Sequence, residues 1–143
     1  MSASVLFRLD ERLLAAPLEQ VQEVLRAAGV EDLQGTRAPV TGVLSLRGRP
    51  VPVVDLRSRA YPGRTGDALV VQAPPAPGVA DGDVVVLAVD SVDRVLGDGD
   101  AGAVRPAGVG LPDYVSGTTQ LAGSGDEVLV VDLWRLAGLV PQQ

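Results

Sequence analysis

The chain is predicted to be mostly β, as a barrel or sandwich of short strands, from three features of its composition. Its hydrophobic content is 46% but its aromatic content is only 3%, so the core must consist of Val, Leu and Ala. Valine, like other β-branched residues, favours strands. Seventeen Gly and eleven Pro indicate many turns. At 143 residues, we expect a single domain that spans residues 1–143.

Turn residues and hydrophobic periodicity divide the chain into short elements. The expected strands are residues 4–10, 12–16, 42–46, 51–56, 67–73, 83–90, 92–96, 114–121 and 127–132. Loops are expected at residues 74–82, which are rich in Pro and Gly, and at residues 97–112, which are rich in Gly. A short closing helix is expected at residues 133–139, with Leu133, Leu136, Ala137 and Val140 facing inward.

The segment after Pro17 fits two structures. Leu18, Val21, Val24 and Leu25 recur at a spacing near that of a helix, and Gly29 would end it. We therefore expect a helix or a helical turn from Pro17. The alternation in QVQEVL, residues 20–25, leaves a strand open as the alternative.

The most distinctive stretch is GVLSLRGRPVPVVDLR, residues 42–57. It reads as two apolar runs around a tight Arg47-Gly48-Arg49 turn. Pro50 and Pro52 cannot donate ladder hydrogen bonds, so the second strand should have an edge or a bulge near its start. A glycine is expected in such a turn, but two arginines need a further explanation.

The two halves of the chain repeat one motif. Gly42, Leu46 and Gly48 recur 75 positions later as Gly117, Leu121 and Gly123. VVDL at residues 53–56 recurs 77 positions later at residues 130–133, so the second turn is two residues longer. The repeat predicts two related, intertwined β subdomains, each with a hairpin in its motif block, 42–56 or 117–133. Arg47 becomes Ala122, so a structural role shared by both halves would not need the arginine.

Composition excludes several kinds of function. The net charge is −6, which disfavours nucleic acid or an anionic membrane as a partner. With no His, no Lys and no Cys, the chain lacks an imidazole base, a Schiff-base lysine and a thiolate. It has no signal peptide and no apolar run of the roughly 18 residues that span a membrane. We expect a soluble cytoplasmic protein, in which carboxylates are the only conventional acid and base groups left to an enzyme.

Acidic clusters are the remaining candidates for chemistry. Asp81-Gly82-Asp83 and Asp98-Gly99-Asp100 are the densest, but the closing position of a calcium loop counted from Asp98 is Val109. Asp and Gly are common turn formers, so we interpret both clusters as turns. Residues 63–66 lack the spacing and the lysine of a phosphate loop. No metal site and no cofactor are expected.

The hairpin residues resemble those of a known family, the CheW-like domain. Its pattern is roughly G-V-x-N-L-R-G-x-x-V-P-V-x-D-L-R, against GVLSLRGRPVPVVDLR here. QVQEV at residues 20–24 is similar to its K-V-Q-E-I stretch, and AVDSVDRVL at residues 88–96 to its V-D-x-V-x-x-V-L segment. YVSGTTQLAGSGDEVLVVDLWRL, residues 114–136, resembles its last strand pair and closing helix. The resemblance covers nearly the whole chain.

The resemblance implies two small five-stranded β-barrels with short helices, side by side around a hydrophobic core. It also implies an adaptor without catalysis or cofactor, which couples the cytoplasmic tips of chemoreceptors to the regulatory domain of the histidine kinase CheA. It carries roles onto particular residues, expected near a groove between the subdomains where the receptor tip docks. These residues are Val21, Glu23, Gly42, Val43, Leu44 and Arg47.

The expected centre of this site is Arg47 near Glu23, either as an ion pair that shapes the surface or as a direct contact. Arg is a favoured interface anchor, and an Arg–carboxylate pair can be bidentate. Arg49 is interpreted as a solvated turn residue, and Arg57 as a cap of the turn after Asp55. Asp55 and Asp132 recur in both halves, so they are expected to accept backbone hydrogen bonds at strand ends.

The sequence departs from the family pattern in several places. Ser45 stands where Asn is preferred, Leu44 where a small polar residue is common, and Arg49-Pro50 replaces an apolar pair. These departures bear on which receptors are recognised. The alternatives are a CheW-like module of a larger signalling protein, as in CheV or CheA, or a small-ligand-binding or hydrolytic β-barrel with paired carboxylates. An OB-type nucleic-acid barrel is disfavoured by charge and by the few aromatic residues.

Overall fold

A computed structural model describes residues 3–28, 31–32, 40–57, 66–72 and 84–139, and all structural statements concern these residues. Its strands are β1 (Ser4–Leu9), β2 (Arg12–Pro17), β3 (Val21–Ala28), β4 (Glu31–Asp32), β5 (Gly42–Leu46), β6 (Arg49–Asp55), β7 (Gly66–Gln72), β8 (Val84–Ala88), β9 (Ser91–Leu96), β10 (Arg105–Pro106), β11 (Val115–Gln120) and β12 (Glu127–Val131). The helices are a 3₁₀ turn, Leu18–Gln20, and α1 (Leu133–Leu136). Within the described part, no helix is long and apolar enough to cross a membrane.

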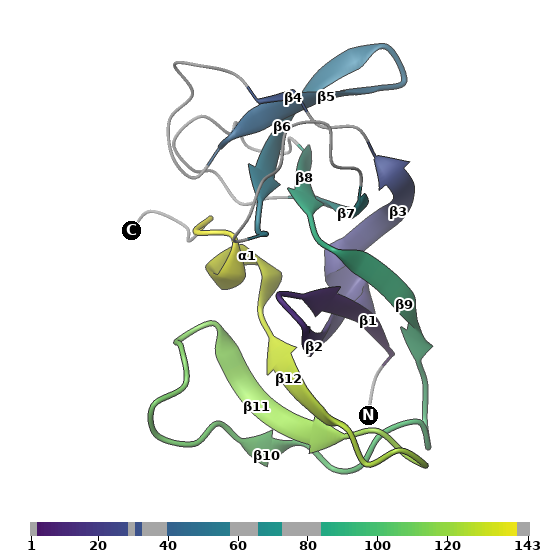
Figure 1. Ribbon diagram of the computed structural model, residues 1–143, viewed down its shortest axis with the longest axis vertical. Helices are drawn as coiled ribbons and strands as arrows, with labels where there is room; N and C mark the ends of the chain where they lie inside the picture. The colour runs from purple at the N-terminus through teal and green to yellow at the C-terminus, as the bar shows by residue number, and fades with distance from the viewer. Residues whose placement is uncertain (1–2, 29–30, 33–39, 58–65, 73–83, 140–143) are drawn as a thin grey trace.

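The strands form two six-stranded sheets, one above the other in Figure 1. The lower sheet has the order β10-β11-β12-β2-β1-β9, and the upper sheet has the order β3-β7-β8-β6-β5-β4. In each sheet, five strands have five to eight residues and one has two. The prediction of a mostly β protein with two related subdomains is confirmed.

The two sheets are built from a tandem repeat whose strands are exchanged. Starting from β10 in one sheet and from β4 in the other, the elements follow in the same order. A two-residue strand comes first, then the two strands of a hairpin, then a strand parallel to the second of these, its antiparallel partner and an edge strand. Strands β1–β6 therefore correspond in order to β7–β12. Each sheet contains the first two strands of one repeat and the last four of the other. This exchange makes the two halves intertwined.

The strand registers show that the repeat holds residue by residue. In β6, Val53 pairs with Val86. The residue that corresponds to Val53 in the second repeat, which we call its repeat mate, is Val130 in β12, and it pairs with Ala15. In the edge strands, Glu23 pairs with Val70 and Arg94 with Leu6, and both ladders are irregular beside this pair. The segments VQEVL (21–25) and VDRVL (92–96) are thus structural equivalents, 71 positions apart.

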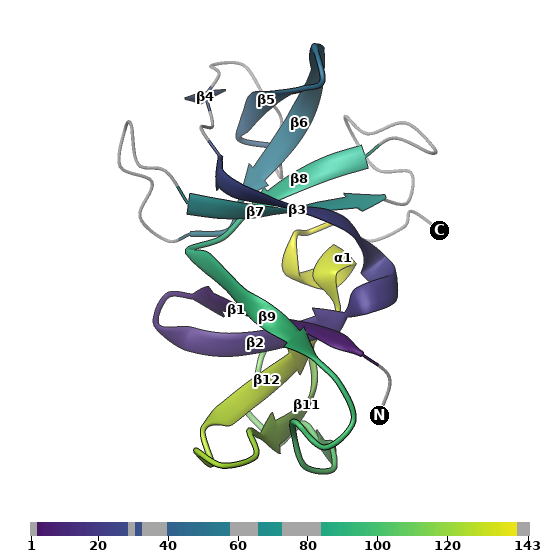
Figure 2. The same ribbon diagram turned by 90° about the vertical axis from the view of Figure 1, so that its right-hand side faces the viewer.

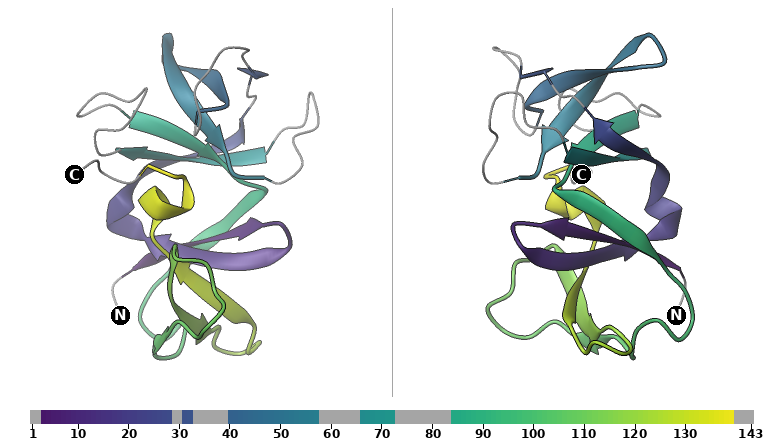
Figure 3. Two further views of the ribbon diagram at one scale, coloured as in Figure 1. Left: turned by 90° about the vertical axis from the view of Figure 1, so that its left-hand side faces the viewer. Right: turned by 45° about the vertical axis from the view of Figure 1, so that its right-hand side comes forward.

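One apolar core lies between the sheets. Buried residues of the lower sheet, such as Phe7, and of the upper sheet, such as Leu87, belong to the same cluster. Leu133, Ala137 and Leu139 add the C-terminal segment to this cluster, and α1 lies between the two sheets (Figure 2). The view from the opposite side shows the same layering (Figure 3). The predicted inward face of the closing helix is confirmed for Leu133 and Ala137, and Leu136 is half-buried against the same cluster. Val140 lies outside the described residues.

Each sheet also has a smaller core of its own. In the lower sheet it contains Leu6, Leu13, Ala15, Leu96, Leu121 and Val128. In the upper sheet the repeat mates of these residues take the same places: Val70, Val84, Val86, Leu25, Leu46 and Val51. The curl of each sheet therefore buries the face that does not meet the other sheet.

The helix expected from Pro17 is wrong beyond Gln20. A 3₁₀ turn covers Leu18–Gln20, and residues 21–28 form the edge strand β3, the alternative that the alternation had left open. The reason is that Val21 and Val24 pack against the shared core while Leu25 packs against the core of the upper sheet. A strand with an irregular ladder can reach both cores, which lie on its opposite sides, and a single helical face cannot.

The other boundaries lie close to the predicted ones. Strand β6 includes Pro50 and Pro52, but it pairs with β8 only from Val53 onward, so the start of the strand has the predicted free edge. The two-residue strands β4 and β10 were not predicted, and β10 lies inside the expected loop 97–112. The predicted loop 74–82 and the turn at Asp81-Gly82-Asp83 lie outside the described residues.

Candidate functional site

The hairpin β5–β6 turns through two residues, both in the left-handed region. Leu46 pairs with Arg49, which leaves Arg47 and Gly48 as the loop, with φ of 50° and 77°. Positive φ at both positions defines a type I′ turn, which favours Asn, Asp or Gly. Glycine adopts this conformation freely, whereas an arginine does so at a cost in free energy. The turn alone does not explain an arginine at position 47.

Arg47 forms an ion pair with Glu23. Its Nη2 lies 2.6 Å from Glu23 Oε1, and the two side chains are 70% and 32% exposed. The charge-assisted hydrogen bond runs through a single pair of atoms, so the bidentate geometry is not the one observed. The structure therefore brings together the two residues at the predicted centre of the site.

The ion pair connects strands that are not neighbours in the sheet. Three strands, β7, β8 and β6, separate β3 from β5 in the upper sheet. A contact between Glu23 of β3 and the tip of β5–β6 requires the sheet to curl until its two sides approach each other. The guanidinium and the carboxylate meet across the opening of this curled sheet, on the surface of the molecule.

The other predicted site residues lie on the strands β3 and β5 and differ in burial. Val21 is half-buried against the shared core, and Leu44 is half-buried against the core of the upper sheet. Gly42 is buried and Val43 is half-buried, and the backbone of Val43 pairs with Glu31 in β4 and with Pro52 in β6. Of the predicted residues, the structure therefore brings Glu23 and Arg47 together, while Val21, Val43 and Leu44 are partly exposed apolar residues of the strands β3 and β5.

The remaining predicted residues have structural places. Arg57 forms a buried ion pair with Asp55, 2.8 Å apart, and its backbone N–H also donates to Asp55. Asp132 accepts from the N–H groups of Trp134 and Arg135 and caps α1. Arg49 is exposed, as predicted for a solvated turn residue.

A group around Asp67 was missed by the sequence reasoning. The Asp67 carboxylate accepts from the Arg26 guanidinium at 2.9 Å, from the Val92 N–H at 2.8 Å and from the Ala27 N–H at 3.2 Å. Burial raises the pKa of this carboxyl, but the two backbone N–H groups and Arg26 lower it further, so its pKa lies below the usual value. These partners are 25 to 41 positions from Asp67, and no local pattern in the sequence indicates them.

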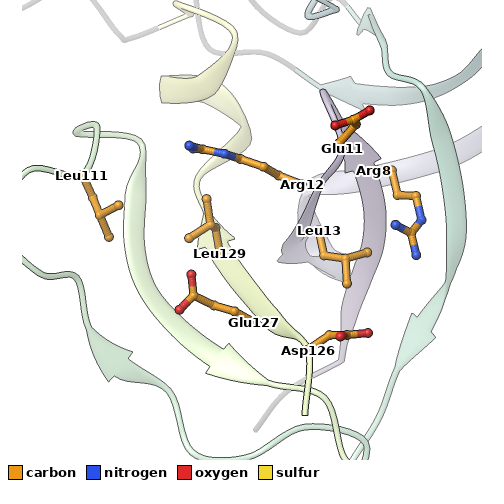
Figure 4. A pocket seen from close by; sticks show the side chains of 8 residues that line it. All are labelled: Arg8, Glu11, Arg12, Leu13, Leu111, Asp126, Glu127 and Leu129. Carbon is orange, nitrogen blue, oxygen red and sulfur yellow. The ribbon is translucent and has the colours of Figure 1, made fainter. Parts of the chain in front are cut away.

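A hollow of about 420 Å³ on the lower sheet tests the alternative of paired carboxylates. It is lined by Arg8, Glu11, Arg12, Leu13, Leu111, Asp126, Glu127 and Leu129. In Figure 4 its three carboxylates come from different edges of the hollow and do not point toward one another. Acid–base catalysis by two carboxylates needs them to converge on one substrate bond, and this arrangement does not provide that.

Metal ligation is not indicated in the part of the chain that the structure describes. No group of three or more potential ligands from Asp and Glu comes together there. Asp98-Gly99-Asp100 forms a turn, with Gly99 at a φ of 86° and the Asp100 carboxylate accepting from Gly97 N–H, as expected for a turn.

The architecture defines a class of protein: an intertwined pair of related β-sheets around one core, with an exposed ion pair between a strand edge and a hairpin. Comparison with known proteins places it more closely. The family model of the CheW-like domain matches residues 3–140, so the chain belongs to this family of scaffold and adaptor proteins in chemotaxis signalling.

A solved structure gives the same answer for the fold. The scaffolding protein TtCheW from Thermoanaerobacter tengcongensis superposes with a TM-score of 0.67 at 20% identity, over 94% of this chain and 91% of that one. At this identity the likeness establishes the fold. No curated protein sequence matches the chain.

Proposed function

We propose that this protein is an adaptor that couples the cytoplasmic tips of chemoreceptors to the regulatory domain of the histidine kinase CheA. It acts in the cytoplasm as a single domain, by binding alone, without catalysis, cofactor or metal. Its membership of a family of scaffold and adaptor proteins supports this function. The observation that carries the proposal is the Glu23–Arg47 ion pair, which lies at the positions expected for receptor and kinase coupling.

The geometry supports a binding role for Arg47. The side chain is 70% exposed although its charge is paired, so a partner can still reach most of the guanidinium. Its other N–H groups are available to a partner's carboxylate or carbonyl, while Glu23 holds its orientation. A preorganised arginine beside partly exposed apolar side chains is the arrangement of an interface anchor.

The test is a binding measurement with purified proteins. Wild type, Arg47→Ala and Arg49→Ala are titrated against a chemoreceptor signalling tip and against the CheA regulatory domain. We expect Arg47→Ala to lower the affinity for one or both partners by about 10- to 30-fold, the effect of an interface hot spot. Arg49→Ala removes an arginine two positions away and is the matched control, with an affinity close to that of wild type.

Other outcomes separate the alternatives. Equal losses for Arg47→Ala and Arg49→Ala would mean that the tip contributes only general positive charge. An unfolded Arg47→Ala variant would give Arg47 a structural role. If folded wild type bound neither partner, the adaptor function would be wrong, and a small apolar ligand would be sought in the hollow of about 200 Å³ beside Ala15, Leu96 and Val104.

A further inference from the structure

We propose that Asp67 is a positioning residue of the adaptor site, which holds the end of β3 so that Glu23 meets Arg47. This inference rests on the proposed function for its binding consequence. Its structural part, the position of β3 relative to the β5–β6 hairpin, can be tested without any partner.

The Asp67 carboxylate gathers three donors from two strands. From β3 it accepts the Arg26 guanidinium and the Ala27 N–H, and from β9 it accepts the Val92 N–H. Arg26 also donates to the carbonyl of Val92. The side chain of Asp67 is only 16% exposed, whereas that of Arg26 is 61% exposed, so the carboxylate is the shielded partner of the ion pair. We call this arrangement, formed by Arg26, Ala27, Asp67 and Val92, the clasp.

Strand β3 needs such a support because its own pairing is weak at this end. It is an edge strand with β7 as its neighbour in the sheet, and the ladder is irregular between Leu25 and Ala28. Ala27 lies inside the irregular stretch with a φ of 51°, a left-handed conformation that is unfavourable for alanine. The hydrogen bond from the Ala27 N–H to Asp67 compensates for this strain where the ladder cannot.

The backbone on which Asp67 sits has little room to move. A Cβ at the preceding Gly66 would lie 2.6 Å from the carbonyl oxygen of Val89 and 3.1 Å from Arg57 Nη1, so this position is closely packed. The carbonyl of Asp67 accepts from the Val89 N–H at 3.0 Å, where the chain passes from the upper to the lower sheet. A fixed base under Asp67 allows its carboxylate to hold β3 against β9.

The other half of the molecule shows that the fold does not require the clasp. The repeat mate of Asp67 is Ala3, whose carbonyl accepts from the Leu18 N–H at 3.0 Å just as that of Asp67 accepts from Val89. The mate of Arg26 is Gly97. Neither Ala3 nor Gly97 has a side chain that could form the ion pair. The clasp and the Glu23–Arg47 pair therefore both involve β3, and the equivalent edge strand β9 has neither.

The distance from the clasp to the site is short enough for a direct mechanical effect. Glu23 precedes Arg26 by three residues, about 10 Å along a strand. The contact with Arg47 is one hydrogen bond of 2.6 Å, and such a bond weakens steeply with displacement and misalignment. A shift of the end of β3 would thus separate the carboxylate from the guanidinium.

The partner-free test uses the absence of cysteine from the chain. Nitroxide labels at Gln22→Cys and Ser45→Cys report the distance between β3 and β5 by electron paramagnetic resonance. We expect Asp67→Asn to broaden or shift this distance distribution. Asp93→Asn is the matched control, since it removes the ion pair of Arg8 with Asp93 on β9 and leaves the clasp intact. A distribution in Asp67→Asn identical to that of wild type would overturn the proposal.

The second test uses a cycle of variants in partner binding. Asp67→Asn should lower the affinity for the partner by about three- to tenfold in the wild-type background. In the Arg47→Ala background it should have almost no further effect, because Asp67 acts through the pair. If the double variant lost affinity by the product of the two single-variant factors, Asp67 would act independently of Arg47, and this would contradict the proposal.

Two further outcomes keep the tests separable. If Asp67→Asn fails to fold, Arg26→Gln replaces it, because the two backbone N–H groups then keep the Asp67 carboxylate as their acceptor. Arg26→Gln should change the label distances and the partner affinity in the same direction, but by less. If wild type binds no partner, the proposed function fails while the label distances still decide whether Asp67 positions β3.

Discussion

The two hairpins of the repeat, β5–β6 and β11–β12, occupy equivalent places but turn in different ways. The second has a turn two residues longer, with glycines, Gly123 and Gly125, at its positive-φ positions. The first places Arg47 at one of its two such positions. Outside these two hairpins, Asp10, Glu11 and Ala27 also have positive φ, so glycine is preferred in the left-handed conformation but is not required there. The arginine in the first hairpin has the same conformational cost, and the proposed binding role would explain why it stands there.

The partner of Arg47 differs between the halves as well. The mate of Glu23 is Arg94, and the mate of Arg47 is Ala122. The second half therefore cannot form the ion pair, although its backbone is arranged in the same way. The scaffold is repeated and the proposed site is not: both halves build the shared core, and only the first carries the Glu23–Arg47 pair.

The ends of the molecule extend this contrast to charge. The hairpins β5–β6 and β11–β12 lie toward opposite ends of the long axis in Figure 1. Residues at their tips help to line two hollows of about 410 and 420 Å³. Val84 and Leu13 are repeat mates that line them, but Arg49 in one corresponds to Asp126 in the other. The first hollow is lined by the cations Arg47 and Arg49, whereas the second carries both charges, with Arg8 and Arg12 beside Glu11, Asp126 and Glu127.

The largest expected effect tests whether the two halves fold as one unit. Phe7 and its repeat mate Val71 are both fully buried in the shared core. Phe7→Ala should lower the free energy of unfolding by about 3–5 kcal/mol, and Val71→Ala by about 2 kcal/mol. Both variants should unfold in one transition, measured in denaturant by far-UV circular dichroism and by the fluorescence of Trp134. Separate transitions would mean that the sheets are independent.

This shared core could be predicted only in part from the sequence. The repeat of Gly42 and VVDL indicated two related subdomains, because the residues recur at nearly constant spacing. The exchange of strands between the repeats could not be read from it, since a repeat gives the order of elements and not which of them pair. The choice of strand over helix for residues 21–28 likewise depended on two cores that only the tertiary structure brings together.

The site was predicted to a similar degree. Glu23 and Arg47 are 24 positions apart, and the resemblance of their two motifs to one family suggested that they meet. The clasp had no such signal. Arg26 and Asp67 are 41 positions apart, and Asp67 looked like an ordinary residue at the start of a strand. Contacts of this kind follow from the curl of the sheet and the close approach of β3 to β9.

The clasp predicts that the protein loses stability in acid. The pKa of Asp67 is lower in the folded state than its ordinary value. A carboxyl with a depressed folded pKa stabilises the protein above its unfolded pKa, and this contribution is lost as the pH falls through the folded pKa. In denaturant titrations, the unfolding free energy of wild type should fall as the pH is lowered below about 4. Asp67→Asn should have a lower unfolding free energy already at neutral pH, and it should lose less in acid.

The control for this prediction is again Asp93→Asn. Its unfolding free energy should fall with acid in parallel with that of wild type, because the clasp is intact. Parallel curves for Asp67→Asn and wild type would show that the carboxylate of Asp67 contributes no pH-dependent stability.

A smaller effect should separate conformational cost from function at the turn itself. Arg47→Asn changes the loop to Asn-Gly, the preferred pair for a type I′ turn. Losing the exposed ion pair removes about 0–1 kcal/mol, while relieving the left-handed arginine restores a similar or larger amount. We expect the unfolding free energy to rise by up to about 0.5 kcal/mol while partner affinity falls as it does in Arg47→Ala. A less stable variant that still binds would reverse this assignment.

The smallest expected effect belongs to Arg49, on the other side of the same turn. Its side chain is exposed, and surface substitutions of this kind usually change the unfolding free energy by less than about 0.5 kcal/mol. Arg49→Ala should therefore match wild type in thermal stability. Arg49→Asp copies the charge of Asp126 at the equivalent tip, and it should lower the affinity only for a partner that binds this end through its charge. Salt titration of the partner affinity distinguishes the two cases, because a screened charge effect fades as ionic strength rises and a steric effect does not.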